Sequence, residues 1–305
     1  MQPGPDEIVL HDAHDSRWLH FRRPEQIYST ARPDEILPLL ATIERRVEEE
    51  RLFAAGFLAY EAAPAFDPTL PVRPPAPDFP LLWFGLYAEP ATVALEPAPV
   101  PALPPLPWQP TVTPAKFEAA IAAIKEQIAA GYTYQVNYTF RLRAPFAADP
   151  WRYFLELVEA QEPGYGAYVD TGRFAICSAS PELFLRRDGH TVASRPMKGT
   201  ARRGLTWEGD RCQAEWLQQS EKNRAENVMI VDMIRNDLGR VARSGSVTVD
   251  ELFAVERYPT VWQMTSTISA MTDVSHSRLL QATFPCASIT GAPKRSTMGI
   301  IAALE

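Results

Sequence analysis

The sequence has few of the residues that build a disulfide framework or a zinc site. It contains three cysteines, Cys177, Cys212 and Cys286, and none of them forms a Cys-X-X-Cys pair. An odd and widely spaced set of cysteines excludes both kinds of site as the basis of the fold. We therefore expect unpaired thiols in a reducing compartment.

The sequence also lacks a long hydrophobic run. No stretch reaches the roughly 20 apolar residues that a membrane-spanning helix needs. The opening segment Met1–Glu7 has neither the basic flank nor the apolar run of a signal peptide. These absences predict a cytoplasmic protein with no membrane-spanning segment.

An excess of positive charge is absent as well. The chain has 30 Lys and Arg against 37 Asp and Glu, a formal net charge of −7. Neither nucleic acid nor an anionic membrane would be attracted to such a surface, so we expect no partner of either kind. None of the five histidines lies in a nucleophile or metal pattern, and the sequence has no GxGxxG, P-loop or GxSxG motif.

The chain has 305 residues, of which 46% are hydrophobic, enough for one large domain or two smaller ones. Residues 1–112 form the first predicted region. Helical spacing of apolar residues predicts a helix over Pro33–Glu50, and apolar runs predict strands over Phe53–Tyr60 and Leu81–Tyr87. Sixteen of the 29 prolines fall between Pro64 and Pro114, which excludes regular helix there and predicts an extended connector over Pro97–Pro110.

Residues 113–305 form the second predicted region. Thr113-Pro114 is a favourable helix start, and Gly131 is a favourable stop. A β-rich block is expected over about 132–200, with a hairpin turn at Asp188-Gly189. The remaining expected elements are helices near 209–219, 220–241 and 293–305 and a strand over 261–271.

Lys198 is the first candidate for chemistry. It stands at the end of a predicted strand and is followed by Gly199 and Thr200, whose amides and hydroxyl are suited to an anion. A lysine partly removed from water acts as a nucleophile or a base. Taken alone, however, the residue type favours the alternative of an exposed surface lysine, because most lysines are exposed.

Glu182 is the second candidate, on the first arm of the same hairpin. A carboxylate among Pro181, Leu183 and Phe184 would be driven toward its neutral form, as a general acid requires. A two-residue turn at Asp188-Gly189 would place Glu182 opposite Arg195. Strict alternation then puts Glu182 and Lys198 on opposite faces unless a bulge intervenes. An outward-facing strand residue is the alternative.

Glu226 shares the face of a predicted helix with Ile230 and Met233. An acid on an apolar stripe is either paired with a cation or bound to a metal, and its oxygens suit Mg²⁺. The segment from Ser288 to Lys294 is a turn that leads into a helix. Its amides and hydroxyls are suited either to a carboxylate or to plain capping. The charged residues of 232–237 are expected to hold the end of the helix near 220–241 to its neighbours.

Taken together, the segments resemble the chorismate-utilising enzymes. The resemblance covers most of the chain and is most specific from Thr113 onward. The matching strings are Gly56–Glu61, Tyr134–Asn137, Ser180–Leu183, Arg195–Thr200, Arg224–Asn227, Arg235–Arg240, Glu256–Ser266 and Ser288–Lys294.

The resemblance implies an α/β fold with two large, mainly antiparallel sheets packed between helices. It also selects a branch of the family. Lysine before Gly199-Thr200 is typical of aminodeoxychorismate synthases, where anthranilate synthases have alanine. Gln135 stands where isochorismate and salicylate synthases carry a water-activating lysine, and Gln263 stands where anthranilate synthases have histidine. The implied reaction is amination of chorismate at C4, for p-aminobenzoate and folate biosynthesis.

The resemblance further implies roles for individual residues. Lys198 would add covalently to the ring while Glu182 protonates the leaving hydroxyl. Mg²⁺ would neutralise the ring carboxylate, with Glu226 as one ligand, and a separate glutamine amidotransferase subunit would supply ammonia. Substrate binding is expected at Gly199, Thr200, Gln263, Ser288, Thr290 and Gly291.

The final predicted helix reaches Glu305 without a glycine or a turn signal. The resemblance implies that the family continues beyond this point with a second glutamate that binds magnesium and with further residues that bind the substrate. We therefore expect a catalytic domain that is incomplete at its C-terminal end. Two alternatives stay open: an enzyme like anthranilate synthase component I, and an inactive truncated fragment.

Overall fold

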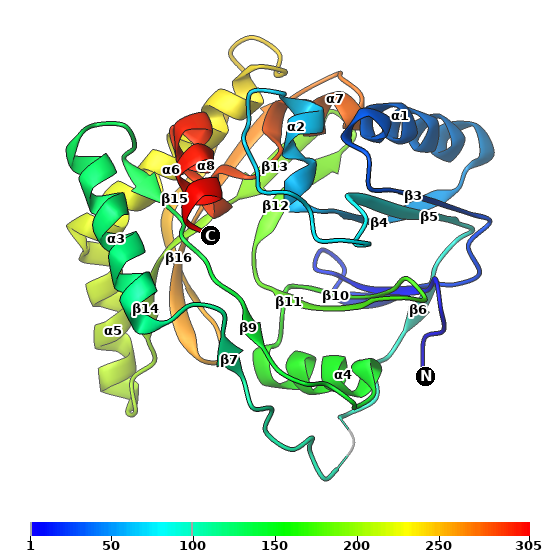
Figure 1. Cartoon of the computed structure of the whole chain (residues 1–305), viewed down its shortest axis with the longest axis horizontal. Coiled ribbons are helices and arrows are strands. Elements are labelled where there is room, and N and C mark those ends of the chain that lie inside the picture. Colours follow the sequence, from blue (N-terminus) through cyan, green and yellow to red (C-terminus); the bar gives the residue numbers. More distant parts are fainter. Residues whose placement is uncertain (1, 99) are drawn as a thin grey trace. The chain divides into compact units, whose positions relative to one another are not determined.

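The computed structural model describes residues 2–98 and 100–305, and the chain divides into two compact units (Figure 1). The first comprises residues 1–65, 75–107 and 144–182, and the second comprises residues 66–74, 108–143 and 183–305. Each unit is thus assembled from separate stretches of chain. The division into sequence regions at residue 113 stays a prediction.

The first unit contains two antiparallel sheets. Five strands run in the order β11 (Ala175–Ser180), β10 (Tyr165–Asp170), β1 (Ile8–Asp12), β2 (Arg17–Phe21) and β6 (Ala91–Val93). Three more run in the order β3 (Gln26–Thr30), β5 (Leu82–Tyr87) and β4 (Phe53–Leu58). Side chains from both sheets share one buried cluster, which includes Ile8, Phe21, Trp83 and Tyr87. Burial of these large apolar side chains stabilises the unit.

Two longer helices cover this unit. Helix α1 (Pro33–Glu50) buries Ile36, Leu40 and Ile43, as its apolar spacing predicts. Helix α4 (Pro150–Gln161) packs Trp151, Phe154 and Leu155 against the five-stranded sheet. The expected helix at Pro33 is confirmed to the residue, and the strands expected at Phe53 and Leu81 are confirmed with slightly shorter bounds. The predicted strand from Phe53 ends at Leu58 because residues 60–62 form a 3₁₀ turn, and the short helix α2 (Ala63–Phe66) follows.

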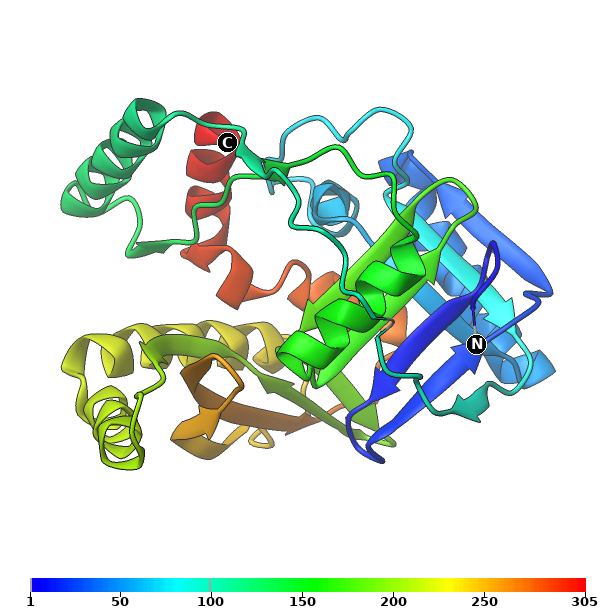
Figure 2. The same ribbon diagram turned by 90° about the horizontal axis from the view of Figure 1, so that it is seen from below.

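The second unit is built on another five-stranded antiparallel sheet. Its order is β12 (Leu183–Asp188), β13 (Thr191–Arg195), β16 (Val261–Met271) and β14 (Met197–Arg202), and β15 (Thr248–Arg257) also pairs with β16. Helices α5 (Trp207–Gln219) and α6 (Glu221–Gly239) lie along it (Figure 2). Val192 and Ile268 of the sheet form a buried cluster with Ile230, Ile234 and Leu238 of α6.

The rest of this unit consists of short strands and three helices. The elements are β7 (Gln109–Pro110), α3 (Pro114–Ala129), β8 (Gln135–Val136), β9 (Leu142–Arg143), α7 (His276–Thr283), a 3₁₀ turn (Ala287–Ile289), β17 (Gly291–Ala292) and α8 (Lys294–Leu304). The Thr113 hydroxyl accepts a hydrogen bond from the Lys116 amide at 3.3 Å, which confirms the expected capping of α3. The connector over 97–110 is confirmed as mostly non-regular, but Pro99 within it lies outside the described residues.

Every strand pair among the described residues is antiparallel. The expected fold class, α/β with two large antiparallel sheets and helices packed on them, is therefore confirmed. No helix among residues 2–98 and 100–305 combines the length and the apolar character needed to cross a membrane.

Candidate functional site

Lys198 lies on β14 at an irregularity in the sheet. The pairing of β14 with β16 shifts register between Met197 and Thr200, so the peptide units of Lys198 and Gly199 fall outside the regular ladder. Gly199 has φ +108°, a left-handed conformation that favours glycine. A Cβ there would also lie 3.1 Å from the Cβ atoms of Asn223 and Met264. The Lys-Gly-Thr string thus folds into a bulge that only glycine accommodates without strain.

Asn227 of α6 takes the place of the missing ladder partner. Its Nδ2 donates to the carbonyl oxygens of Lys198 (3.2 Å) and Met264 (3.4 Å). Its Oδ1 accepts a 2.6 Å hydrogen bond from the Ser266 hydroxyl. Asn227 is 1% exposed, so these bonds satisfy polar groups that water does not reach. The helix therefore fixes the backbone that carries Lys198.

We expect replacement of Asn227 by alanine to lower the free energy of unfolding by about 2–4 kcal/mol, because it leaves buried acceptors and the Ser266 hydroxyl unpaired. Urea denaturation of the variant measures this. Asn236→Ala, an exposed asparagine on the same helix, is the matched control and should cost far less. An equal, small loss in both variants would contradict the role assigned to Asn227.

The Lys198 side chain is half-buried, and its Nζ donates to Oδ1 of Asn137 at 3.4 Å. Asn137 in turn reaches the segment 288–291. Its amide donates to the carbonyl oxygen of Thr290 at 2.8 Å, and its Nδ2 donates to that of Ile289 at 3.4 Å. The structure thus connects Lys198, through Asn137, to a segment that lies about 90 positions later in the sequence.

The turn that contains Ser288, Thr290 and Gly291 is tightly packed. Thr290 is fully buried, and its hydroxyl donates to the carbonyl oxygens of Cys286 and Ala287, both at 3.2 Å. The Ser288 hydroxyl lies 3.1 Å from the Cys286 sulfur. These two hydroxyls hold the turn itself together, which matches the capping alternative for this segment. Substrate binding by Ser288 and Thr290 stays a prediction.

Gly291 shows why glycine is needed in this turn. It pairs with Val136 of β8 and has φ +146°. A Cβ at Gly291 would stand 2.0 Å from the carbonyl oxygen of Gln135 and 2.7 Å from a methyl group of Thr297. No real Cβ tolerates such contacts, so a side chain at this position would separate β17 from β8.

Thr200 and Gln263 meet on the adjoining strands. They are paired residues of β14 and β16, and the Thr200 hydroxyl donates to Oε1 of Gln263 at 3.0 Å. Thr200 as a whole residue is exposed. The structure therefore brings together two of the predicted substrate-binding residues next to Lys198.

Glu226 lies on α6 immediately before Asn227. Its side chain is 36% exposed, and its Oε1 is 3.8 Å from Nζ of Lys222, one turn earlier on the helix. The described residues contain no cluster of three or more His, Cys, Asp or Glu side chains suited to a metal. Mg²⁺ often binds through one or two carboxylates together with water and substrate oxygens, so the accessible Glu226 carboxylate fits as a single ligand.

Glu182 belongs to the first unit and lies between β11 and β12. Its amide donates to the Ser180 hydroxyl at 3.3 Å. The hairpin that follows differs from the expected one: Asp188 pairs with Thr191, so Gly189-His190 form the turn, and Leu183, not Glu182, is paired with Arg195. A bulge between Leu183 and Arg186 shifts the register, so strict alternation does not apply along this arm.

Of the charged residues of 232–237, Asp237 has the predicted structural role, because it forms a buried ion pair. Lys294 Nζ donates to Oδ2 of Asp237 at 2.7 Å and to the carbonyl oxygen of Thr283 at 3.0 Å. Both charged side chains are only 12% exposed. Burial raises the pKa of the Asp237 carboxyl, although the charges of Lys294 and Arg240 oppose the rise. The pair joins α6 to the start of α8.

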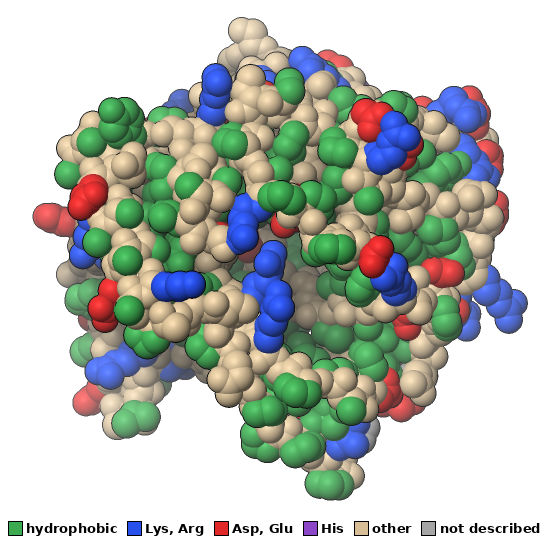
Figure 3. Space-filling model, in the orientation of Figure 1, with side chains coloured by type: hydrophobic (Ala, Val, Ile, Leu, Met, Phe, Trp, Pro, Cys, Tyr) green, Lys and Arg blue, Asp and Glu red, His purple; other side chains and the backbone are tan. Residues whose placement is uncertain are grey.

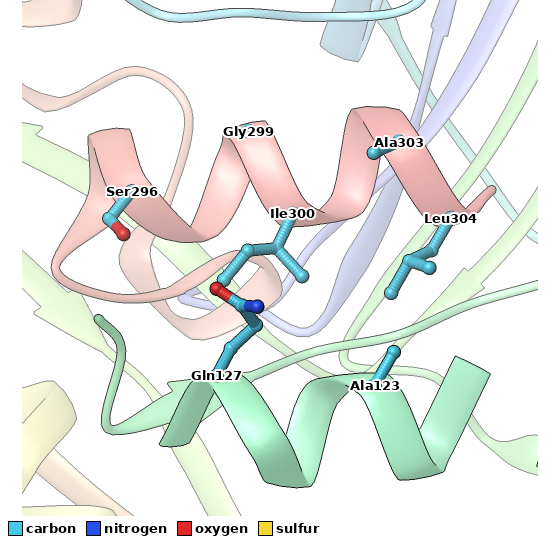
Figure 4. A pocket seen from close by; sticks show the side chains of 7 residues that line it. All are labelled: Ala123, Gln127, Ser296, Gly299, Ile300, Ala303 and Leu304. Carbon is cyan, nitrogen blue, oxygen red and sulfur yellow. The ribbon is translucent and has the colours of Figure 1, made fainter. Parts of the chain in front are cut away.

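A separate groove of about 330 Å³ lies between α3 and α8 (Figure 4). Its lining residues are Ala123, Gln127, Ser296, Gly299, Ile300, Ala303 and Leu304. None of them carries a charge, so the groove offers no ionic partner for a carboxylate. Hydrophobic side chains are also scattered over the part of the surface where α3 lies (Figure 3). Phe117 and Ile128 of that helix are among the exposed large hydrophobic residues.

The sequence is similar to a known protein family and to several characterised relatives. Residues 93–305 match the family model described as chorismate binding enzyme. Over 200 residues the chain is 43% identical to aminodeoxychorismate synthase component 1 of Escherichia coli, and over 191 residues it is 41% identical to that of Bacillus subtilis. These alignments cover 65% and 62% of this chain but only 44% and 41% of the relatives, so the matched part spans less than half of their length. Anthranilate synthase component 1 of Aquifex aeolicus is 36% identical over 200 residues, which are 65% of this chain and 40% of that protein.

Solved structures show the same fold at low sequence identity. Anthranilate synthase component I of Streptococcus pneumoniae superimposes with a TM-score of 0.81 at 21% identity, over 100% of this chain and 78% of that one. A putative 2,3-dihydroxybenzoate-specific isochorismate synthase of Bacillus anthracis superimposes with a TM-score of 0.77 at 17% identity, over 100% and 79%.

Proposed function

The chain belongs to the family of chorismate-binding enzymes, and we propose that within this family it is an aminodeoxychorismate synthase. The observation that carries the proposal is Lys198, half-buried on a fixed bulge and followed by Gly199 and Thr200. Relatives named aminodeoxychorismate synthase, at 41–43% identity, support the same branch. The substrate would be chorismate, and the product 4-amino-4-deoxychorismate.

The proposed reaction has two steps. The Lys198 amine first forms a bond to the chorismate ring, while the C4 hydroxyl leaves as water with a proton from Glu182. Ammonia then forms a bond at C4 as the bond to Lys198 breaks, so the enolpyruvyl group is retained. The Thr200 hydroxyl and the amides around Gly199 would bind the substrate, with Gln263 orienting Thr200 through the observed hydrogen bond.

Two further components complete the proposal. Bound Mg²⁺ would neutralise the ring carboxylate, and Glu226 would be one of its ligands. A glutamine amidotransferase subunit would supply the ammonia, as the words "component 1" in the names of the relatives suggest for those proteins.

The experiment that tests this function identifies the product. The protein at its natural full length is incubated with chorismate, ¹⁵N-ammonium and Mg²⁺, and the products are separated by mass. We expect ¹⁵N-labelled aminodeoxychorismate that keeps its enolpyruvyl group. Anthranilate with release of pyruvate would assign the chain to the other branch. If the full-length protein is active, the same assay on residues 1–305 alone tests whether this stretch is inactive.

We expect Glu226→Gln to raise the Mg²⁺ concentration that gives half-maximal activity by about 10–100-fold, since loss of a carboxylate weakens metal binding. A Mg²⁺ titration of the initial rate measures this. Glu215→Gln, an exposed glutamate of α5 that pairs with Arg211, is the matched control. The same Mg²⁺ dependence in Glu226→Gln and the native protein would remove Glu226 from the metal site.

A further inference from the structure

The sheet of the second unit has one face toward helices and one face with polar side chains. Met264 of β16 belongs to a buried cluster that includes a leucine of α5, and the Ser266 hydroxyl donates to an asparagine of α6. Successive side chains of a strand point to opposite faces, so Gln263 and Thr265 point away from these helices. The hydrogen bond between Thr200 and Gln263 therefore lies on the polar face.

Glu256 of β15 lies beside this hydrogen bond on the same face. Gln263 pairs with Thr200 of β14 on one side and with Glu256 on the other, so the three residues form one row across the sheet. The side chains of directly opposite residues share a face, with Cβ atoms about 4.5–5.5 Å apart. The Glu256 carboxylate is thus next to two of the predicted substrate-binding residues.

The Glu256 carboxylate accepts three hydrogen bonds. Its Oε1 accepts from Nη2 of Arg195 and from the Thr265 hydroxyl, and its Oε2 accepts from the Tyr258 hydroxyl at 3.2 Å. Thr265 is 1% exposed, and the Glu256 side chain is 22% exposed. Hydrogen bonds to an ionised acceptor are roughly twice as strong as neutral ones, so this carboxylate holds its donors firmly in place.

The ion pair of Glu256 with Arg195 connects the two edges of β16. Ile268 pairs with residues of both β13 and β15, so these two strands lie on opposite edges of β16. Arg195 is the last residue of β13, and Glu256 belongs to β15, so their bridge crosses β16. It reaches the far edge just before the bulge between Met197 and Thr200, where the regular pairing with β16 is interrupted.

We propose that Glu256 is a positioning residue for Thr200 and Gln263. Its bridge to Arg195 holds the edge strand in place where backbone pairing with β16 is interrupted. Asn227 fixes the same bulge from the helix side, and Glu256 does so from the polar face. This inference rests on the proposed function, in which Thr200 binds chorismate and Gln263 orients it.

The test is Glu256→Gln, which keeps the shape of the side chain and removes its charge. Groups that bind substrate and transition state alike affect KM and leave kcat nearly unchanged. We therefore expect the KM for chorismate to rise about 10-fold in the full-length protein, because charge-assisted bonds are lost. A purely structural role would instead reduce the amount of folded protein, which lowers the apparent kcat and leaves KM unchanged. Glu251→Gln, an exposed glutamate of the same strand, is the matched control and should change neither parameter.

Arg195→Met completes a double-mutant cycle and also serves if Glu256→Gln fails to fold. We expect Arg195→Met to raise KM by the same factor. The double variant should also show a rise of about 10-fold and not the product of about 100-fold, because both changes break one bridge. An unchanged KM in either folded single variant, or a fully additive rise in the double variant, would overturn the proposal.

The KM for chorismate can be measured whichever product the protein forms. A protein that forms anthranilate but shows the expected KM pattern would reject the proposed function and retain the role of Glu256. A protein that forms aminodeoxychorismate with the same KM in Glu256→Gln and the native form would retain the function and reject the role of Glu256.

Discussion

Replacement of Lys198 by alanine should reduce aminodeoxychorismate formation by on the order of 10³-fold or more in the full-length protein, because it removes the proposed nucleophile. The carbonyl oxygen of Lys198 would still accept from Asn227, so the bulge that carries the residue should persist. The thermal midpoint should therefore change little. Initial rates of product formation, measured beside thermal unfolding curves, separate these two effects.

Two further variants serve as comparisons for Lys198→Ala. Lys198→Arg keeps the positive charge but not the nucleophilic amine, so we expect it to be as inactive as Lys198→Ala. Lys125→Ala removes an exposed lysine from α3 and should leave the rate unchanged. Near-native activity in Lys198→Arg would show that Lys198 acts through its charge alone and not as a nucleophile.

Replacement of Lys294 by methionine should lower the free energy of unfolding by about 3–5 kcal/mol at neutral pH, because it leaves the buried Asp237 carboxylate without its cation. Methionine preserves the length of the side chain, so lost packing contributes little. Urea denaturation measures the change. The double variant Asp237→Asn with Lys294→Met removes both charges, and we expect it to recover more than half of the loss.

The same pair predicts a pH dependence. Burial raises the pKa of Asp237 in the folded protein above its ordinary 3.8, and loss of Lys294 removes an interaction that lowers it. The folded state then binds more protons than the unfolded state, so stability from this group falls as the pH rises through that window. The deficit of Lys294→Met should therefore be largest near pH 7 and shrink as the pH is lowered toward the raised pKa. A deficit independent of pH, or a double variant as unstable as the single one, would contradict the assignment.

Local signals predicted the helices and the long strand well. Helix α1, helix α6 and strand β16 lie where apolar spacing, capping residues and β-branched runs placed them. Helix α4 interrupts residues 132–200, which the sequence pattern predicts as one β-rich block. The signal was present: Asp149 caps the helix by accepting from the Trp151 amide at 3.0 Å, and Pro150 follows at the first helical position.

The site was predictable only in part. Resemblance to the family predicts Lys198, Thr200 and Gln263 as site residues, and the structure brings the last two into contact. Asn137 and Asn227 belong to the strings that match the family, but those strings predict no role for either residue. Their importance arises from hydrogen bonds across 61 and 29 positions of sequence, which no local pattern reveals. The register of the β12–β13 hairpin could not be predicted from the sequence either, because it depends on a bulge that packing determines.

A covalent bond between Lys198 and chorismate would be the most direct sign that the lysine is the nucleophile. The full-length protein is mixed with chorismate and Mg²⁺ in the absence of ammonia, quenched rapidly and mapped by peptide mass spectrometry. We expect an adduct on the Lys198 peptide with the mass of chorismate less one water, and we expect ammonium to release it as aminodeoxychorismate. Rapid product formation without any adduct at Lys198, or an adduct on another residue, would contradict this role of Lys198.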